Sequence, residues 1–80
     1  GNTVRFSGDN GIELQSSDTV LIDNNDVRFV GDNGIYADQS SNLTISNNTI
    51  DDTLDDGIDV NGGNNITITN NLIGVLFGNI

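Results

Sequence analysis

The stretch NGIYADQSSNLTISNNTI, residues 33–50, decides the fold because the chain nearly repeats it as DGIDVNGGNNITITNNLI at residues 56–73. An ungapped shift of 23 residues superposes the two phrases, and the same shift backwards reaches NGIELQ at residues 10–15. The aligned columns include Gly11, Gly34 and Gly57; Ile12, Ile35 and Ile58; Leu14, Ala37 and Val60; Val20, Leu43 and Ile66; Ile22, Ile45 and Ile68; and Val4, Val27, Ile50 and Ile73. A fixed period of this length predicts a repeat architecture.

Within each unit the apolar residues come in pairs two apart, at positions 12/14, 20/22 and 27/29 of the first unit. A period of two indicates β-strands, and the flanking Gly, Asn, Asp and Ser residues indicate turns. Three short strands per 23-residue coil, each stacked on its counterpart, predict an all-β parallel β-helix of about three and a half coils. With strands about 4.8 Å apart, this rod would be only ~17 Å tall.

Glycine and asparagine recur at the expected turns. We expect Gly11, Gly34 and Gly57 to mark bends with a positive φ, which glycine tolerates. The asparagine pairs at 24–25, 47–48 and 70–71 have two explanations that the sequence leaves open. Asparagine accepts a left-handed bend, and stacked asparagines form amide ladders.

Composition limits the functional classes. The 80 residues support one small domain, and 12 carboxylates against two arginines give a net charge of −10, which excludes nucleic acid as a partner. The acidic surface favours a hydrated extracellular or cell-surface setting. The chain has no cysteine, and it has no apolar run long enough to predict a membrane span.

The two phrases at 33–50 and 56–73 resemble the right-handed parallel β-helix repeats of pectate lyases, mannuronan C5-epimerases and NosD-like proteins. The resemblance covers nearly the whole chain and implies a right-handed solenoid. It does not specify function, because this fold serves enzymes and structural fibres alike.

Catalytic residues implied by the resemblance carry over poorly. The epimerase motif ends in Asp-Pro-His, and this chain has neither His nor Pro. An arginine base of the pectate lyase kind would be Arg5 or Arg28, with Tyr36 as a further candidate. Arg28 is followed in its column by Asp51, so the simpler interpretation is a surface ion pair between these two residues, worth ~0–1 kcal/mol. The sequence therefore disfavours an enzyme.

An acidic run, DDTLDDGID at residues 51–59, is the densest chemical feature. Clustered carboxylates suit calcium, which takes 6–8 oxygen ligands, so calcium is the candidate cofactor. The spacing matches neither an EF-hand nor the nonapeptide calcium repeat, and a solvated acidic turn is the alternative. The candidate metal ligands are Asp51, Asp52, Asp55, Asp56 and Asp59.

Asp52 conflicts with the expected core. It falls in a column with Phe6, Phe29 and Val75, which we expect to point inward, and an unpaired carboxylate is costly to bury. Either the strand bulges and Leu54 takes the core position, or an ion neutralises Asp52.

A second acidic column contains Asp9, Asp32 and Asp55. Like charges on neighbouring strands repel, so either bound cations or outward splay must relieve the column. We favour splay because Gly8 and Gly31 precede the first two carboxylates.

Three glycosylation sequons begin at Asn42, Asn47 and Asn65. Chance explains them well in a sequence so rich in Asn and Thr. Asn47 is the weakest candidate because we assign it to the amide ladder.

Both ends are in repeat phase and carry no evident cap, and residues 72–80 are the most apolar stretch. A solenoid coil buries its apolar face only against a neighbouring coil, so residues 1–80 are expected to belong to a longer solenoid or to an end-to-end assembly. The leading hypothesis is a secreted, non-catalytic structural solenoid: a surface fibre, matrix filament or spike segment that associates with itself through its coil ends. The alternatives are a fragment of an epimerase or lyase acting on an acidic polysaccharide, and a calcium-dependent binding module.

Overall fold

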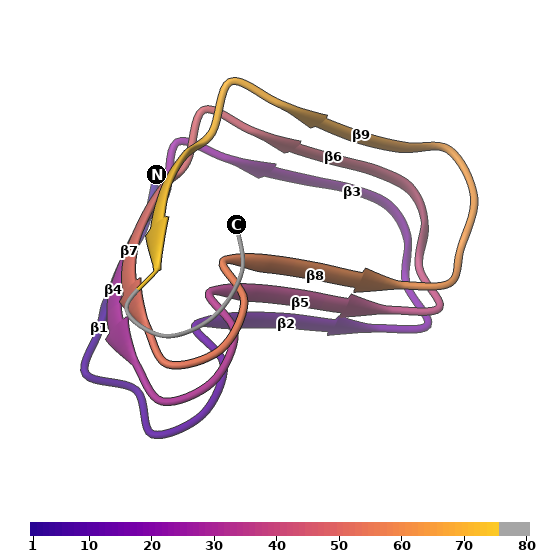
Figure 1. Ribbon diagram of the computed structural model, residues 1–80. Helices are drawn as coiled ribbons and strands as arrows, with labels where there is room; N and C mark the ends of the chain where they lie inside the picture. The colour runs from indigo at the N-terminus through magenta and orange to yellow at the C-terminus, as the bar shows by residue number, and fades with distance from the viewer. Residues whose placement is uncertain (76–80) are drawn as a thin grey trace.

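A computed structural model of the chain describes residues 1–75 and contains ten β-strands (Figure 1). The strands are β1 (Thr3–Arg5), β2 (Ile12–Gln15), β3 (Asp18–Asp23), β4 (Asp26–Val30), β5 (Ile35–Asp38), β6 (Ser41–Ser46), β7 (Thr49–Thr53), β8 (Ile58–Asn61), β9 (Ile66–Thr69) and β10 (Leu72–Val75). The side chain of Val75 and the predicted apolar tail at 76–80 lie outside the described residues. Residues 1–75 contain no helix that could cross a membrane.

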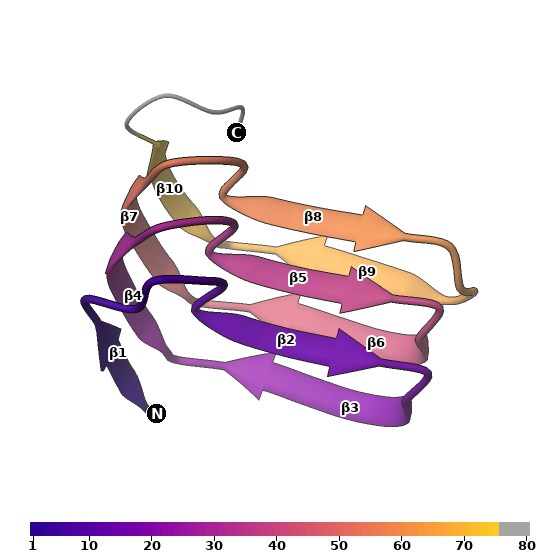
Figure 2. The same cartoon turned by 90° about the horizontal axis from the view of Figure 1, so that it is seen from below.

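The strands form three parallel sheets that run around one axis, in the orders β1-β4-β7-β10, β2-β5-β8 and β3-β6-β9 (Figure 2). Ile12 pairs with Ile35 and Ile35 with Ile58, a step of 23 residues each time. The predicted parallel β-helix, with three strands per 23-residue coil, is therefore confirmed.

The core is a stack of aliphatic columns inside the coil. Within residues 1–75 the buried apolar side chains are Ile22, Val27, Val30, Ile35, Ala37, Leu43, Ile45 and Ile50, and all but Ile22 lie on strands with a neighbour on both sides. Most of their counterparts on edge strands are only partly buried, and Ile68 is 47% exposed, because a neighbouring rung covers them on one side alone. Burial thus depends on the rung above as well as the rung below.

The asparagine pairs have both predicted roles, one for each member. The first members, Asn24, Asn47 and Asn70, have φ between 55° and 57° and form a left-handed corner. The second members form a ladder: the backbone N–H of Asn25 donates to Oδ1 of Asn48 at 2.9 Å, and the backbone N–H of Asn48 donates to Oδ1 of Asn71 at 2.9 Å. Asn47 therefore lies outside the ladder, and the assignment that made it the weakest sequon was wrong.

The explanation given for the repeated glycines was wrong. Among the described residues only Gly62 and Gly63 are glycines with a positive φ. A Cβ on Gly34 would lie 2.6 Å from the carbonyl oxygen of Gly57, and one on Gly11 would lie 2.6 Å from that of Gly34. Glycine is needed there because the neighbouring rung approaches the backbone too closely for a side chain.

The predicted inward column of aromatic residues was also wrong. Phe6 and Phe29 are 77% and 47% exposed. Val30 and Thr53, which follow Phe29 and Asp52 in the chain, are buried instead. The cause is a left-handed residue at Phe6, Phe29 and Asp52 (φ 52° to 57°), which reverses the inside–outside alternation. The strand is irregular at Asp52 as one alternative expected, since Gly74 pairs with Asp51 and Val75 with Thr53, but Leu54 does not take the core position because it is 49% exposed and Thr53 is buried. An ion beside Asp52 stays a prediction.

Candidate functional site: an exposed aromatic corner

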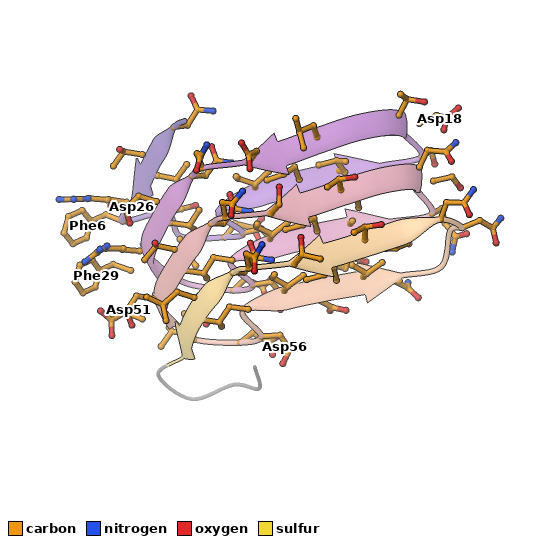
Figure 3. The ribbon with its side chains drawn as sticks, turned by 90° about the horizontal axis from the view of Figure 1, so that it is seen from above. Phe6, Asp18, Asp26, Phe29, Asp51 and Asp56 are labelled. Atoms are coloured by element: carbon orange, nitrogen blue, oxygen red, sulfur yellow. The ribbon has the colours of Figure 1, made fainter. Side chains whose placement is uncertain are left out.

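Phe6 and Phe29 project from the corner where the β1-β4-β7-β10 sheet turns towards β2-β5-β8 (Figure 3). Their rings stack in parallel, with centroids 5.2 Å apart and planes inclined by 7°. Both residues hold φ near +55°, which is unusual for a bulky side chain. Strained, exposed aromatic residues are a recurring feature of functional surfaces, so this corner is the first candidate site.

A groove of about 640 Å³ runs beside the two rings. Its lining residues are Phe6, Ser7, Gly8, Phe29, Val30, Gly31, Asp52 and Leu54. The two lining glycines pack backbone against backbone, since a Cβ on Gly31 would lie 2.7 Å from the carbonyl oxygen of Gly8. The lining is therefore mostly apolar, and Asp52 is the ionisable residue in it.

Charged residues border the rings on the same corner. Nε of Arg28 lies 2.6 Å from Oδ1 of Asp26, whereas Nη2 of Arg5 is 3.8 Å from Oδ2 of the same carboxylate. The predicted pair of Arg28 with Asp51 is therefore replaced by a pair within β4. Asp51 lies one rung further on and projects from the same side of the solenoid (Figure 3).

Arg28 is poorly suited to act as a base. The hydrogen bond to Asp26, followed by its charge and those of Asp51 and Asp52, raises the pKa of Arg28 above its ordinary value. A general base needs its pKa shifted towards the working pH, which for arginine is downwards. Tyr36 lies on another sheet, where its register partners are Glu13 and Asp59. The arginines and Tyr36 thus stand on separate sheets.

The acidic run does not converge on one point. Asp51 and Asp52 lie at the aromatic corner, and Oδ1 of Asp51 accepts the backbone N–H of Asp52 at 2.9 Å. The backbone N–H of Asp56 donates to Oδ1 of Asn33 at 3.0 Å, and Asp59 pairs in register with Tyr36 on the β2-β5-β8 sheet. Within residues 1–75 no group of three or more acidic side chains is arranged to hold a metal ion. The calcium site at Asp51, Asp52, Asp55, Asp56 and Asp59 stays a prediction.

The second acidic column contains one carboxyl group with a shifted pKa. Partial burial raises the pKa of Asp32, and the neighbouring carboxyl groups of Asp55 and Asp9 raise it further. The expected outward splay of this column stays a prediction.

The three sequons lie at exposed left-handed corners, with φ of 52° at Asn42, 55° at Asn47 and 57° at Asn65. The Nδ2 groups of Asn42 and Asn47 donate to carboxylates of the preceding coil, at 2.8 and 2.9 Å. The Nδ2 group of Asn65 donates to Oδ1 of Asn42 at 3.0 Å. Glycosylation stays a prediction at all three positions.

The aromatic corner was not predicted from the sequence, because the period-two pattern placed Phe6 and Phe29 inside the coil. The available signal was the pair of adjacent hydrophobic residues Phe29 and Val30, which breaks strict alternation.

A family model described as "Right handed beta helix region" matches residues 1–76. Comparisons with curated proteins and with solved structures gave no match.

Proposed function

Since the chain belongs to the right-handed β-helix family, we propose that it is a non-catalytic structural segment of a longer or self-associating solenoid, at the cell surface or outside the cell. One observation carries the proposal. The 23-residue register continues into the last described coil, where Ile68 is 47% exposed although Ile45 directly below it is fully buried. A further rung would bury Ile68 as the existing rungs bury Ile45.

Hydrogen bonding supports the same conclusion. The backbone N–H of Leu43 donates to the carbonyl of Asn65 in the next coil at 3.1 Å. The equivalent N–H in the last described coil, that of Ile66, points towards the next rung position. Such strand edges pair readily with another strand. The ends of the stack are therefore suited to self-association, or to continuation by more chain.

The state of Arg28, one of the two arginines that the resemblance offers as a base, supports a non-catalytic role. The hydrogen bond to Asp26 and the nearby carboxylates raise the pKa of Arg28, against the requirement for a catalytic base. The net charge of −10 keeps such a rod hydrated and soluble, which supports an extracellular location.

End stacking is tested with two lysine variants on β9. A charged residue on the inner face of an edge strand blocks edge pairing. Position 68 faces the inside of the coil and is half-exposed in the single chain, so the lysine of Ile68→Lys can reach solvent there but would be buried if another rung stacked on it. Thr67→Lys places the same charge on the outer face, where stacking would leave it exposed. We expect electron microscopy of the 80-residue chain to show rods longer than one chain for the parent and for Thr67→Lys, and single particles for Ile68→Lys. A parent that stays monomeric at high concentration would contradict self-association and leave only continuation of the solenoid by more chain.

Enzymatic activity and calcium dependence need separate measurements. The protein is incubated with alginate and with pectate in the presence of calcium, and the products are examined for unsaturated ends or altered stereochemistry. We expect neither, and turnover would overturn the non-catalytic role. Addition of a chelator tests the calcium prediction. A calcium ion bound to the folded state raises its melting temperature, so the chelator would lower the melting temperature if calcium is bound.

A further inference from the structure

Three asparagines stand directly before a glycine: Asn10, Asn33 and Asn61. An asparagine followed by glycine deamidates readily, because glycine has no side chain to hinder attack of its backbone nitrogen on the side-chain amide of the asparagine. For this attack, the nitrogen has to give up any hydrogen bond that it donates, and the amide has to turn towards it. The hydrogen bonds around each Asn-Gly pair therefore decide which pair reacts.

The first two pairs are held by the next coil. The backbone N–H of Gly34 donates to the carbonyl of Asp56 at 2.9 Å, and Oδ1 of Asn33 accepts the backbone N–H of Asp56 at 3.0 Å. Gly11 and Asn10 make the same two bonds to Asn33, at 3.0 and 3.1 Å. In both pairs the attacking nitrogen and the amide are therefore fixed.

The third pair, Asn61 and Gly62, lies exposed where β8 ends, on the last described rung of its sheet. In the two rungs below, the N–H groups of Ser16 and Gln39, at the same position of the coil, each donate to the carbonyl of the next rung, at 2.9 and 2.8 Å. Within residues 1–75 the N–H of Gly62 has no such partner. Nδ2 of Asn61 donates only to the exposed side of the rung below, to Oδ1 of Asp38 at 3.1 Å, where water can replace the bond.

We propose that Asn61 is the site of spontaneous deamidation in this chain, and that a rung lying above it suppresses the reaction. The backbone nitrogen of Gly62 loses its proton to water and attacks Cγ of Asn61. The N–Cγ bond forms, the Cγ–Nδ2 bond breaks, and the amide nitrogen leaves as ammonia. Water then opens the cyclic imide at either of its carbonyl groups, which gives aspartate or isoaspartate.

The product alters the edge of the β2-β5-β8 sheet. Asp38 and Asn61 are register partners on β5 and β8. Deamidation replaces the amide that donates to Asp38 with a second carboxylate, and like charges on neighbouring strands repel. Isoaspartate also inserts one carbon atom into the backbone at the end of β8. Deamidation therefore weakens the pairing of β8 with the rung below.

Peptide mapping measures all three sites in one sample. Single chains are isolated by size exclusion from the parent or, if the parent is entirely in rods, from Ile68→Lys, and are incubated at neutral pH and body temperature. A protease that cuts before aspartate places Asn10, Asn33 and Asn61 in separate peptides, because aspartates lie between them. Fragmentation in the mass spectrometer then locates each conversion of amide to acid. We expect Asn61 to react at least about tenfold faster than Asn10 or Asn33, because each covered pair has two hydrogen bonds to break.

A matched variant separates coverage by a rung from the local geometry of the corner. The double substitution Asp38→Asn, Gln39→Gly builds an Asn-Gly pair one rung below Asn61, at the same position of the coil. Gln39 already has φ of 53°, which glycine tolerates, and its N–H is bonded to the carbonyl of Asn61. The introduced asparagine should react about two- to tenfold more slowly than Asn61 of the same chain, since one hydrogen bond has to break first.

The unfolded chain supplies the reference, because in urea the three native pairs lose these hydrogen bonds and should react at similar rates. Equal rates at the three pairs in folded single chains, or faster reaction at Asn10 or Asn33, would overturn the assignment of Asn61. An introduced asparagine that reacts as fast as Asn61 would overturn the protective effect of a rung.

Rods of the parent test end stacking separately, and this comparison alone rests on the proposed function. A further rung would pair with the N–H of Gly62, so Asn61 should react more slowly in rods than in single chains. An unchanged rate in rods would contradict end stacking, while the comparison among the three pairs in single chains would still decide the site of deamidation.

Discussion

Removing the side chain of Asn48 tests whether the internal amide ladder holds the rungs together. Oδ1 of Asn48 accepts both the backbone N–H and the Nδ2 group of Asn25, at 2.9 and 3.0 Å. Its Nδ2 donates to the carbonyl of Ile22 at 3.0 Å. Asn48 and Asn25 are buried, so water cannot replace these bonds.

The magnitude follows from the groups left without a partner. Asn48→Ala strands two donors of Asn25 and the carbonyl of Ile22, and each buried unsatisfied group costs about 1–3 kcal/mol. Because the amide of Asn25 can reorient, we expect a total of about 3–5 kcal/mol. Small domains have only about 5–15 kcal/mol of stability, so this loss would be large.

Urea unfolding followed by circular dichroism measures the effect, with Asn47→Gly as the matched control. Asn47 is the exposed neighbour, and glycine preserves its left-handed backbone, so the control should cost less than about 1 kcal/mol. If the two variants lose equal stability, the ladder does not hold the rungs and the reasoning fails.

Three further predictions concern other columns of the stack. Gly34→Ala should cost about 1–3 kcal/mol by overpacking, whereas Gly8→Ala, with no atom within 4 Å of the new Cβ, should be neutral in the same urea titration. Folding raises the pKa of Asp32 above 3.8, so the contribution of Asp32 to the free energy of unfolding becomes unfavourable as pH rises above 3.8. Asp32→Asn should therefore have a higher melting temperature than the parent at pH 7, and the two melting temperatures should converge below pH 3.8. Hydrogen bonds from the amide of Asn47 and the hydroxyl of Ser46 lower the pKa of Asp23, so the ionised Asp23 stabilises the fold above pH 3.8 and this stabilisation is lost as pH falls. Asp23→Asn should have a lower melting temperature than the parent at pH 7, and the same melting temperature at about pH 2. Equal melting temperatures at pH 7 would contradict either carboxylate prediction.

The sequence was sufficient for the stacking but not for the outline of the coil. An ungapped period identifies which residues lie above one another, and Ile12, Ile35 and Ile58 do so as predicted. The period does not reveal which side of the backbone a column faces. The left-handed backbone at Phe29 turns that side chain outward and brings Val30 into the core. In the next coil the left-handed backbone at Asp52 brings Thr53 into the core in the same way.

The candidate site was missed for the same reason. Asp52 looked like a carboxylate buried in an aromatic column, whereas that column forms an exposed corner. Non-glycine residues with a positive φ carry no strong sequence signal when they are Phe, Thr or Gln. The two roles of the asparagine pairs were recognisable from sequence, but only the structure separates the bending Asn47 from the bonding Asn48.

The most direct test of the stacked 23-residue coil is disulfide formation between introduced cysteines, since the chain has none of its own. Thr44 and Thr67 are register partners on β6 and β9, whereas Thr69 pairs with Ser46 and lies diagonal to Thr44. Adjacent positions fall within the Cα separation of about 4.4–6.8 Å that a disulfide needs, and diagonal positions at about 7–8 Å do not. We predict rapid oxidation of the Thr44→Cys, Thr67→Cys pair and little oxidation of Thr44→Cys, Thr69→Cys. Equal or reversed rates would contradict the stacked coil.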